Sequence, residues 1–446
     1  MSNKNSLKAY NDNNVYILGA GFSADAGLPL IKDFTNYLRE AGDWLEEQEN
    51  RIGREEEIEA ISKVLEFRLK AASAAFRIPL DVENIEELFS LASAKGGESL
   101  KKSMILAIAA TLDYAHSTKP ILDDAPEDCF RVGRLKSMSE GWIKPKNWRQ
   151  EKDIGQRNYY SCPDYEYYLG VMSGYFNSEK PESENTIITF NYDTLVEEAL
   201  DELGFNISYG PEKFIGYREH NKFNKPRIHR KKIKVLKLHG SVNWCDWFEI
   251  KKSETPSPER FLNAPKKLTD DFKDFVGVFE NYASLRERSF IPLLVPPTWQ
   301  KFMTGFLPKV WDEAVEAIRT ATRIIIIGYS IPHTDQHFKY LMAAGLQENI
   351  SLRKVLFVNK AFEQNSNENK SKIEERLQNL FRPEHFDLGV VETIPHSLKE
   401  FLGSPNAAKR PPSFRQLIGR SLNDSSLKDS DDFLWNGLAL GGVIDF

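Results

Sequence analysis

A short turn near the start of the chain combines small residues in a spacing suited to binding phosphates. Gly19–Ser23 has the sequence GAGFS, follows the apolar run Val15–Leu18 and continues to Ala24, which fits GxGxx(G/A). Small residues at these positions permit a tight turn and bring backbone N–H groups close to a dinucleotide pyrophosphate. The motif alone is a weak signal, because a glycine turn after a strand often only ends the strand and binds no ligand.

The usual ribose-binding acid of a dinucleotide site ends a second strand about 20 residues after the glycines. Glu40 lies at that distance but falls within a stretch of helical periodicity. An ordinary dehydrogenase is therefore disfavoured.

A second polar group follows the apolar run 186–190, where Asn191 and Asp193 stand two residues apart. Loops at the carboxyl ends of parallel strands carry side chains into the ligand crevice. Asp193 has an alternative role as a helix N-cap, because a helical segment begins directly after it. Asn191 has no such alternative and is the stronger candidate.

A third group places His239 before Gly240, directly after the apolar run 233–238. The near-neutral pKa of an imidazole suits proton transfer, and this position puts it at the same crevice edge. Further polar turns follow two later apolar runs, with Gly328 and Ser330 after 323–327 and Asn359 after 355–358.

The elements that must position these side chains are short apolar runs separated by helical stretches. Such alternation predicts an α/β fold with a Rossmann-like parallel sheet. We expect helices at about 30–44 and over most of 46–116, then an irregular surface excursion at 121–162. This organisation predicts a discontinuous core over 12–45 and 184–403, a mostly helical insertion over 46–183, and a C-terminal tail over 404–446.

Composition narrows the class of protein. The 446 residues carry a formal net charge of -6, so a basic surface for nucleic acid or anionic membrane is not expected. The three cysteines Cys129, Cys162 and Cys245 form no CxxC pair, which argues against a four-cysteine zinc module and against a disulfide framework. With no apolar run long enough to span a bilayer, we expect a cytoplasmic protein.

Taken in order, the motifs GAGxS, NxD, HG, GxS and a strand-end Asn resemble the sirtuin family over residues 15 to about 360, with a long interruption. More narrowly, Leu294–Trp299 and Gly328–Asp335 look like the bacterial sirtuin-like proteins of antiviral defence, which hydrolyse NAD+. The resemblance implies a sirtuin-like NAD+-binding core, with NAD+ as the substrate and no zinc ribbon. By the same resemblance, Asn191 and Asp193 would hold the nicotinamide ribose and the attacking water, and His239 would be the general base. The residues implied to bind the dinucleotide are Gly19, Ala20, Gly21, Phe22, Ser23, Gly328, Ser330 and Asn359.

The chain departs from protein-deacylating sirtuins at two places. It lacks the zinc-ribbon cysteines, and Gly27–Pro29 continues to Leu30–Lys32 where Asp-Phe-Arg is usual. Loss of the zinc module removes part of the cleft for an acyl-lysine peptide, so water becomes the favoured acceptor. The expected activity is hydrolysis of NAD+ to nicotinamide and ADP-ribose. The alternatives are a protein deacylase and a non-catalytic NAD+ or ADP-ribose sensor.

The resemblance also implies partners. Related proteins often work as multimers with a separately encoded ATPase, so we expect a homo-oligomer and consider an ATPase or a phage protein as activating partners. A membrane partner is not expected, and neither is nucleic acid. The basic run 225–234 is better explained as a solvated loop that protects an edge strand.

Overall fold

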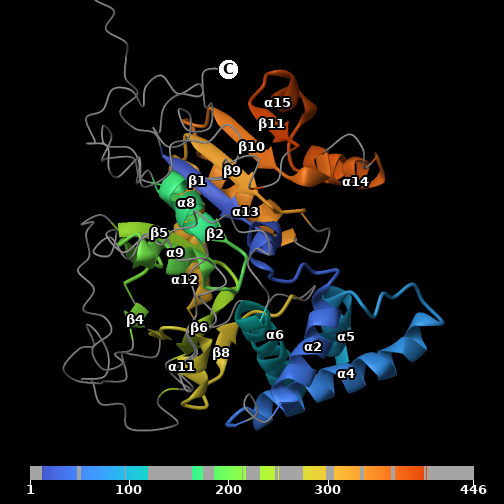
Figure 1. Ribbon diagram of the computed structural model, residues 1–446. Coiled ribbons are helices and arrows are strands. Elements are labelled where there is room, and N and C mark those ends of the chain that lie inside the picture. The colour runs from blue at the N-terminus through green and yellow to red at the C-terminus, as the bar shows by residue number, and fades with distance from the viewer. Residues whose placement is uncertain are drawn as a thin grey trace, which may run out of the picture.

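The computed structural model (Figure 1) describes residues 13–47, 52–95, 97–118, 163–173, 185–212, 214–216, 232–246, 250, 275–297, 306–331, 336–362, 367–395 and 398. The expected excursion at 121–162, most of the basic run 225–234 and the tail 404–446 lie outside these residues.

The centre of the fold is a seven-stranded parallel sheet, which confirms the predicted α/β class. The strands are β1 (Asn14–Leu18), β2 (Thr186–Thr189), β3 (Asn206–Ser208), β5 (Lys232–Lys237), β9 (Arg323–Ile327), β10 (Lys354–Val358) and β11 (Val391–Ile394). Their order in the sheet is β11-β10-β9-β1-β2-β5-β3. The five strands predicted from apolar runs are present to within a residue, whereas β3 and β11 were not predicted.

The strand order reverses at β1. The chain proceeds from β1 to β2 on one side, whereas β9 pairs with the other side of β1. In open parallel sheets the ligand crevice lies outside the carboxyl ends of the strands at such a reversal. The crevice edge between β1 and β9 is therefore where the glycine turn after β1 must lie.

Both faces of the sheet are buried, as the strand composition requires. In β1, Tyr16 and Leu18 belong to one core cluster, while Val15 and Ile17 belong to another. The run of four isoleucines in β9 alternates between the same two clusters. Continuous β-branched and apolar runs are typical of parallel strands that are covered on both sides.

Helices cover the two faces (Figure 1). One face packs against α8 (Pro163–Met172), α9 (Leu195–Glu202) and the short α1 (Ala20–Ser23). The other packs against α12 (Leu307–Thr320), α13 (Gln336–Leu346) and α14 (Asn367–Gln378). A 3-10 turn at Lys360–Phe362 and the short α15 (Pro383–Asp387) connect the last strands.

Four helices form a separate layer beside the sheets, coloured blue to teal in Figure 1. They are α2 (Phe34–Glu46), α4 (Glu55–Ala75), α5 (Ile85–Lys95) and α6 (Glu98–Thr118), which share one apolar cluster. These bounds agree with the predicted helical stretches. Helix α2, which the predicted core range 12–45 contains except for its last residue, packs its buried face within this helical cluster.

The sequence analysis missed a second, four-stranded sheet with the order β4-β7-β6-β8. Its strands are short, with three residues in most of them, so they give no clear period-two pattern. The strands are β4 (Phe214–Gly216), β6 (Gly240–Asp246), β7 (Val276–Val278) and β8 (Pro292–Leu294), and α11 (Tyr282–Arg286) follows β7. Because β6 begins directly after His239, this sheet adjoins that candidate residue.

A buried network of charges fastens the helical layer to this second sheet. Arg54 lies 2.8 Å from Asp113 on α6 and also contacts Glu57 on α4. From α11, Arg286 lies 3.1 Å from Glu57, and Tyr282 donates to the same carboxylate. Removing one member of such a network leaves an uncompensated buried charge, so the layer and the sheet are held in one arrangement.

Substitution of two glycines by alanine distinguishes two sources of lost stability, which are unfavourable backbone conformation and steric clash. Gly328 (φ +63°) and Gly389 (φ +67°) share the left-handed region, but a Cβ at Gly328 would lie 2.3 Å from the Phe22 nitrogen, and one at Gly389 would meet nothing within 4 Å. We expect Gly389→Ala to lower the free energy of unfolding by about 1–2 kcal/mol. Gly328→Ala should lower the free energy of unfolding by about 1–3 kcal/mol more than Gly389→Ala, because the turn after β9 must move away from the turn after β1. Urea unfolding of both variants measures this difference, and equal losses would show that the clash is relieved elsewhere.

Candidate active site

Most of the side chains singled out in the sequence gather at the carboxyl edge of the main sheet. The Gly19–Ser23 turn follows β1, Asn191 and Asp193 follow β2, and His239 follows β5. Because β1, β2 and β5 are adjacent in the sheet, their ends meet. Gly328 and Asn359 follow β9 and β10 on the opposite side of β1.

Ser23, Asn191 and Asp193 form one hydrogen-bonded group. The Ser23 hydroxyl donates to Asp193 Oδ2 at 2.8 Å, and Asn191 Nδ2 donates to the same hydroxyl at 2.9 Å. Ser23 and Asp193 are buried, and Asn191 is partly exposed. The structure therefore brings the NxD pair and the glycine turn into direct contact, although 168 or more residues separate them in the chain.

The second amide contact of Asn191 fixes the orientation of its side chain. Asn191 Nδ2 also donates to the carbonyl of Gly19 at 2.9 Å, and a carbonyl can only accept. Both protons of the amide thus have acceptors within the protein. Asn191 Oδ1 is then the atom suited to accept a hydrogen bond from a ribose hydroxyl or a water molecule.

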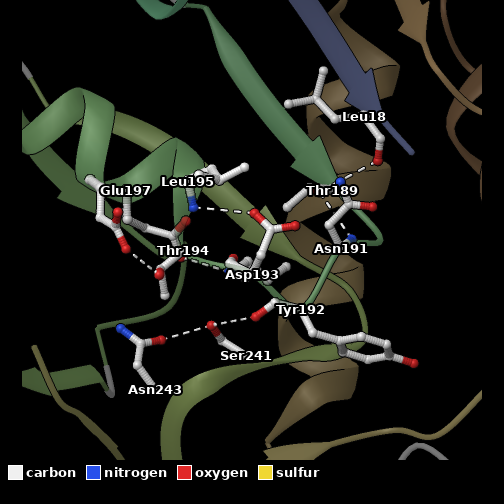
Figure 2. A network of polar contacts seen from close by, with 12 residues as sticks. Leu18, Thr189, Asn191, Tyr192, Asp193, Thr194, Leu195, Glu197, Ser241 and Asn243 are labelled. Atoms are coloured by element: carbon white, nitrogen blue, oxygen red, sulfur yellow. Dashed lines mark hydrogen bonds and ion pairs between the residues drawn. The ribbon is translucent and has the colours of Figure 1, made fainter. Parts of the chain in front are cut away.

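Asp193 contacts the start of α9 but is not its N-cap, which is Thr194, one residue later. Its Oδ1 accepts from the backbone N–H of Leu195, the first residue of α9, at 3.2 Å, as Figure 2 shows. Its Oδ2 accepts from Ser23. One carboxylate therefore serves both the start of a helix and the polar group at the crevice.

His239 lies among aromatic rings. Its ring centroid is 5.2 Å from that of Phe190 and 6.2 Å from that of Tyr192, the two residues that flank Asn191 in the chain. Trp311 packs at 6.4 Å from the imidazole and donates its indole N–H to the carbonyl of Leu238 at 2.9 Å. His239 is 6% exposed, so little of the residue can contact water.

The glycine turn is tied to the protein by its own amides. Gly19 N donates to Ile327 O at 3.0 Å, Gly21 N to Gly328 O at 2.8 Å, and Phe22 N to Gly19 O at 2.9 Å. In this arrangement the small residues serve close packing of two turns. A role of the turn, including Ala20, in binding the phosphates of a dinucleotide remains a prediction.

Three residues expected to bind the dinucleotide, Gly328, Ser330 and Asn359, lie in or against the turn after β9. Ile331 has a φ of 49°, which is unusual for a β-branched residue. Ser330 is exposed, and its carbonyl accepts from Arg376 at 2.9 Å. Asn359 contacts the same turn through Tyr329 O at 3.4 Å and accepts from Ala361 N at 3.0 Å. Strain of this kind is concentrated at ligand sites, which fits the expected roles without testing them.

Behind the polar group lie charged residues that the sequence analysis left without a role. The buried Lys237 lies 2.8 Å from Glu197 and also donates to the backbone oxygen of Asp193. On the next residue of α9, Glu198 accepts from the Thr194 hydroxyl and lies 3.4 Å from His116 of α6. An acidic first turn is ordinary helix-dipole chemistry, so only the tertiary contacts distinguish these residues.

The described part of the chain shows neither a cluster of metal ligands nor a membrane-spanning helix. Within these residues, no group of three or more His, Cys, Asp or Glu side chains is placed to hold a metal ion. None of the helices described is long and apolar enough to cross a membrane.

The contact between His116 and Glu198 predicts a pH dependence of stability. Burial lowers the pKa of His116, but Glu198, with Asp193 and Asp113, outweighs burial and raises this pKa above its ordinary value of 6.5. A raised folded-state pKa stabilises the protein fully below the unfolded value, and this contribution is lost as pH rises through the raised pKa. We expect His116→Gln to be less stable than the wild type at pH 5.5, with the gap narrowing well above pH 6.5. Thermal unfolding across this range measures the gap, and a gap independent of pH would contradict the assignment.

Comparisons with known proteins agree with part of this description. Residues 185–381 match the family model described as SIR2-like domain, a range that includes Asn191, Asp193 and His239. A search of curated proteins found no match to this chain.

Among solved structures, Sir2Tm bound to a propionylated peptide is 13% identical over 87% of this chain and 90% of that one, with a TM-score of 0.29. A structure described as the structural basis for the mechanism and regulation of Sir2 enzymes is 12% identical over 84% of this chain and 94% of that one, also with a TM-score of 0.29. With scores this low, these alignments carry no argument, and the family model is the informative comparison. Residues 185–381 are therefore similar to a SIR2-like domain.

Proposed function

We propose that this protein is an NAD+ glycohydrolase, which cleaves NAD+ to nicotinamide and ADP-ribose. The observation that carries the proposal is the polar group of Ser23, Asn191 and Asp193 at the strand-order reversal, with His239 among aromatic rings after β5. The SIR2-like match to residues 185–381 supports NAD+ as the substrate.

The chemistry of the substrate fits what these residues can supply. Cleavage breaks the bond between the nicotinamide nitrogen and the ribose anomeric carbon, through a transition state with oxocarbenium character. The departing pyridinium takes the bonding electrons and leaves as neutral nicotinamide, so no general acid is required. The site needs to stabilise a ribose cation and to deliver water.

Each candidate residue has a role consistent with its contacts. The Asp193 carboxylate supplies negative charge for the ribose cation, and Asn191 Oδ1 orients a ribose hydroxyl or the water. The His239 imidazole accepts the proton that water loses when its oxygen bonds to the anomeric carbon. Water and NAD+ thus give nicotinamide, ADP-ribose and one proton.

Water is favoured over an acyl-lysine peptide as the acceptor because the sequence lacks the cysteines of a zinc ribbon. We propose further that the reaction depletes cellular NAD+ in antiviral defence, on the resemblance of Leu294–Trp299 and Gly328–Asp335 to that branch of sirtuin-like proteins. Homo-oligomerisation, an ATPase partner and a phage protein as trigger belong to the same proposal. The segments 298–299 and 332–335 of these motifs lie outside the described residues.

The direct test is to incubate the purified protein with NAD+ in heavy-oxygen water, with and without an acetylated peptide. We expect nicotinamide release without peptide, and the label on the anomeric oxygen of ADP-ribose. Release only with peptide would instead identify a deacylase, and binding without release would identify a sensor. Formation of AMP and nicotinamide mononucleotide would show attack on the pyrophosphate and would remove the roles given to Asn191 and His239.

Substitution of the two central residues tests the mechanism. Asn191→Ala and His239→Ala should each slow nicotinamide release by about two to four orders of magnitude, the cost of losing a positioned polar or proton-transfer group. The matched controls are Asn36→Ala and His385→Ala, which change exposed side chains of the same types outside the crevice. Circular dichroism should show that all four variants are folded. Near-normal turnover in a folded Asn191 or His239 variant would exclude that residue from the mechanism.

A further inference from the structure

A lysine side chain lies fully buried beneath the candidate active site. Lys237 is the last residue of β5, and its side chain is 0% exposed. Its Nζ lies 2.8 Å from Glu197 Oε1 and also donates to the backbone carbonyl of Asp193. Glu197 is itself 8% exposed, so the pair is almost completely withdrawn from water.

Charge pairing alone does not explain a lysine at this position. Withdrawing two charges from water costs about as much as their attraction returns, and apolar residues of similar volume often serve stability as well. The cost is visible at Glu197, where burial raises the pKa of the carboxyl although Lys237 opposes the shift. The bond from Lys237 to the Asp193 carbonyl is the contact that an apolar pair could not make.

The placement of Lys237 connects the two loops that carry the candidate catalytic groups. His239 follows Lys237 by two residues, while Asp193 stands on the loop between β2 and α9. The ammonium group thus ties the end of the histidine strand to the main chain of the aspartate. On the adjoining residues, Thr194 is held by Glu198, which His116 contacts from the helical layer. The peptide from Asp193 to Thr194 is therefore held from two elements.

We propose that Lys237 is a positioning residue, which holds the Asp193 main chain so that the Asp193 carboxylate stays directed at Ser23, the residue to which Asn191 also donates. This inference rests on the proposed function, because it assigns Lys237 to the same reaction. Glu197 has a different task in it: Glu197 neutralises the buried ammonium and takes no part in placing Asp193.

A double-mutant cycle distinguishes a positioning role of Lys237 from a role in charge pairing alone. It compares the wild type, Lys237→Met, Glu197→Gln, and the variant with both changes. Lys237→Met leaves a buried carboxylate without its cation, so its unfolding temperature should fall. Glu197→Gln retains an acceptor for Lys237 and should release nicotinamide within about threefold of the wild-type rate. The double variant contains no unpaired charge, and its unfolding temperature should recover relative to Lys237→Met.

Turnover in the double variant decides the inference. We expect kcat for nicotinamide release to stay about tenfold to hundredfold below that of the wild type, the scale of loss from a misplaced catalytic group. The Kd for NAD+, measured by calorimetry, should change by less than about threefold, because the dinucleotide contacts are intact. Lys237→Arg, which keeps a donor, should recover part of the lost turnover.

Recovery of both stability and turnover in the double variant would overturn the inference, because Lys237 would then serve only to pair with Glu197. A parallel loss of kcat and of NAD+ affinity would also overturn it, because it would indicate general disruption of the crevice. Failure of the proposed function is a separate result, recognised when the wild type itself releases no nicotinamide.

Discussion

The close contact between two turns at the centre of the main sheet is the constraint on which the rest of the site depends. The turn after β1 and the turn after β9 meet where the strand order reverses, and Gly21 N donates to Gly328 O at 2.8 Å. A side chain at Gly328 would occupy the space of the Phe22 backbone. Because no side chain fits between the two turns, they pack closely. This packing places Ser23 next to the loop after β2, where its hydroxyl forms hydrogen bonds with Asn191 and Asp193.

Three carboxylates lie close together in the chain near this contact, and cationic side chains pair with two of them. Asp193, Glu197 and Glu198 occupy the start of α9. Lys237 compensates Glu197, and His116 compensates Glu198. Under the proposed function, the Asp193 carboxylate is the group of this set that stabilises a developing cation on a sugar. Each cation comes from a different element, so the charge balance depends on the main sheet and the helical layer together.

The helical layer thus contributes to the site as well as to the bulk of the protein. His116 reaches α9 from the end of α6, and the charges of Arg54, Glu57 and Arg286 fix that layer to the second sheet. The second sheet in turn begins directly after His239. A displacement of the helical layer would therefore disturb both α9 and the second sheet, which begins directly after His239.

The sequence by itself determined five of the seven strands of the parallel sheet and the places where polar residues follow them. Those strands are continuous apolar or β-branched runs, a local signal, and Asn191, Asp193 and His239 directly follow them. The loops at the carboxyl edge could be anticipated as one group because parallel strands present the same ends together.

Only the tertiary structure decided which of these groups touch and what supports them. The bond from Ser23 to Asp193 joins residues 170 positions apart, and the short strands of the second sheet carry too few residues for a recognisable period. Lys237 in a strand and Glu197 in a first helical turn are unremarkable in sequence, since charge at such positions is usually solvated. Their importance arises from burial, and burial depends on packing between distant segments that no local pattern encodes.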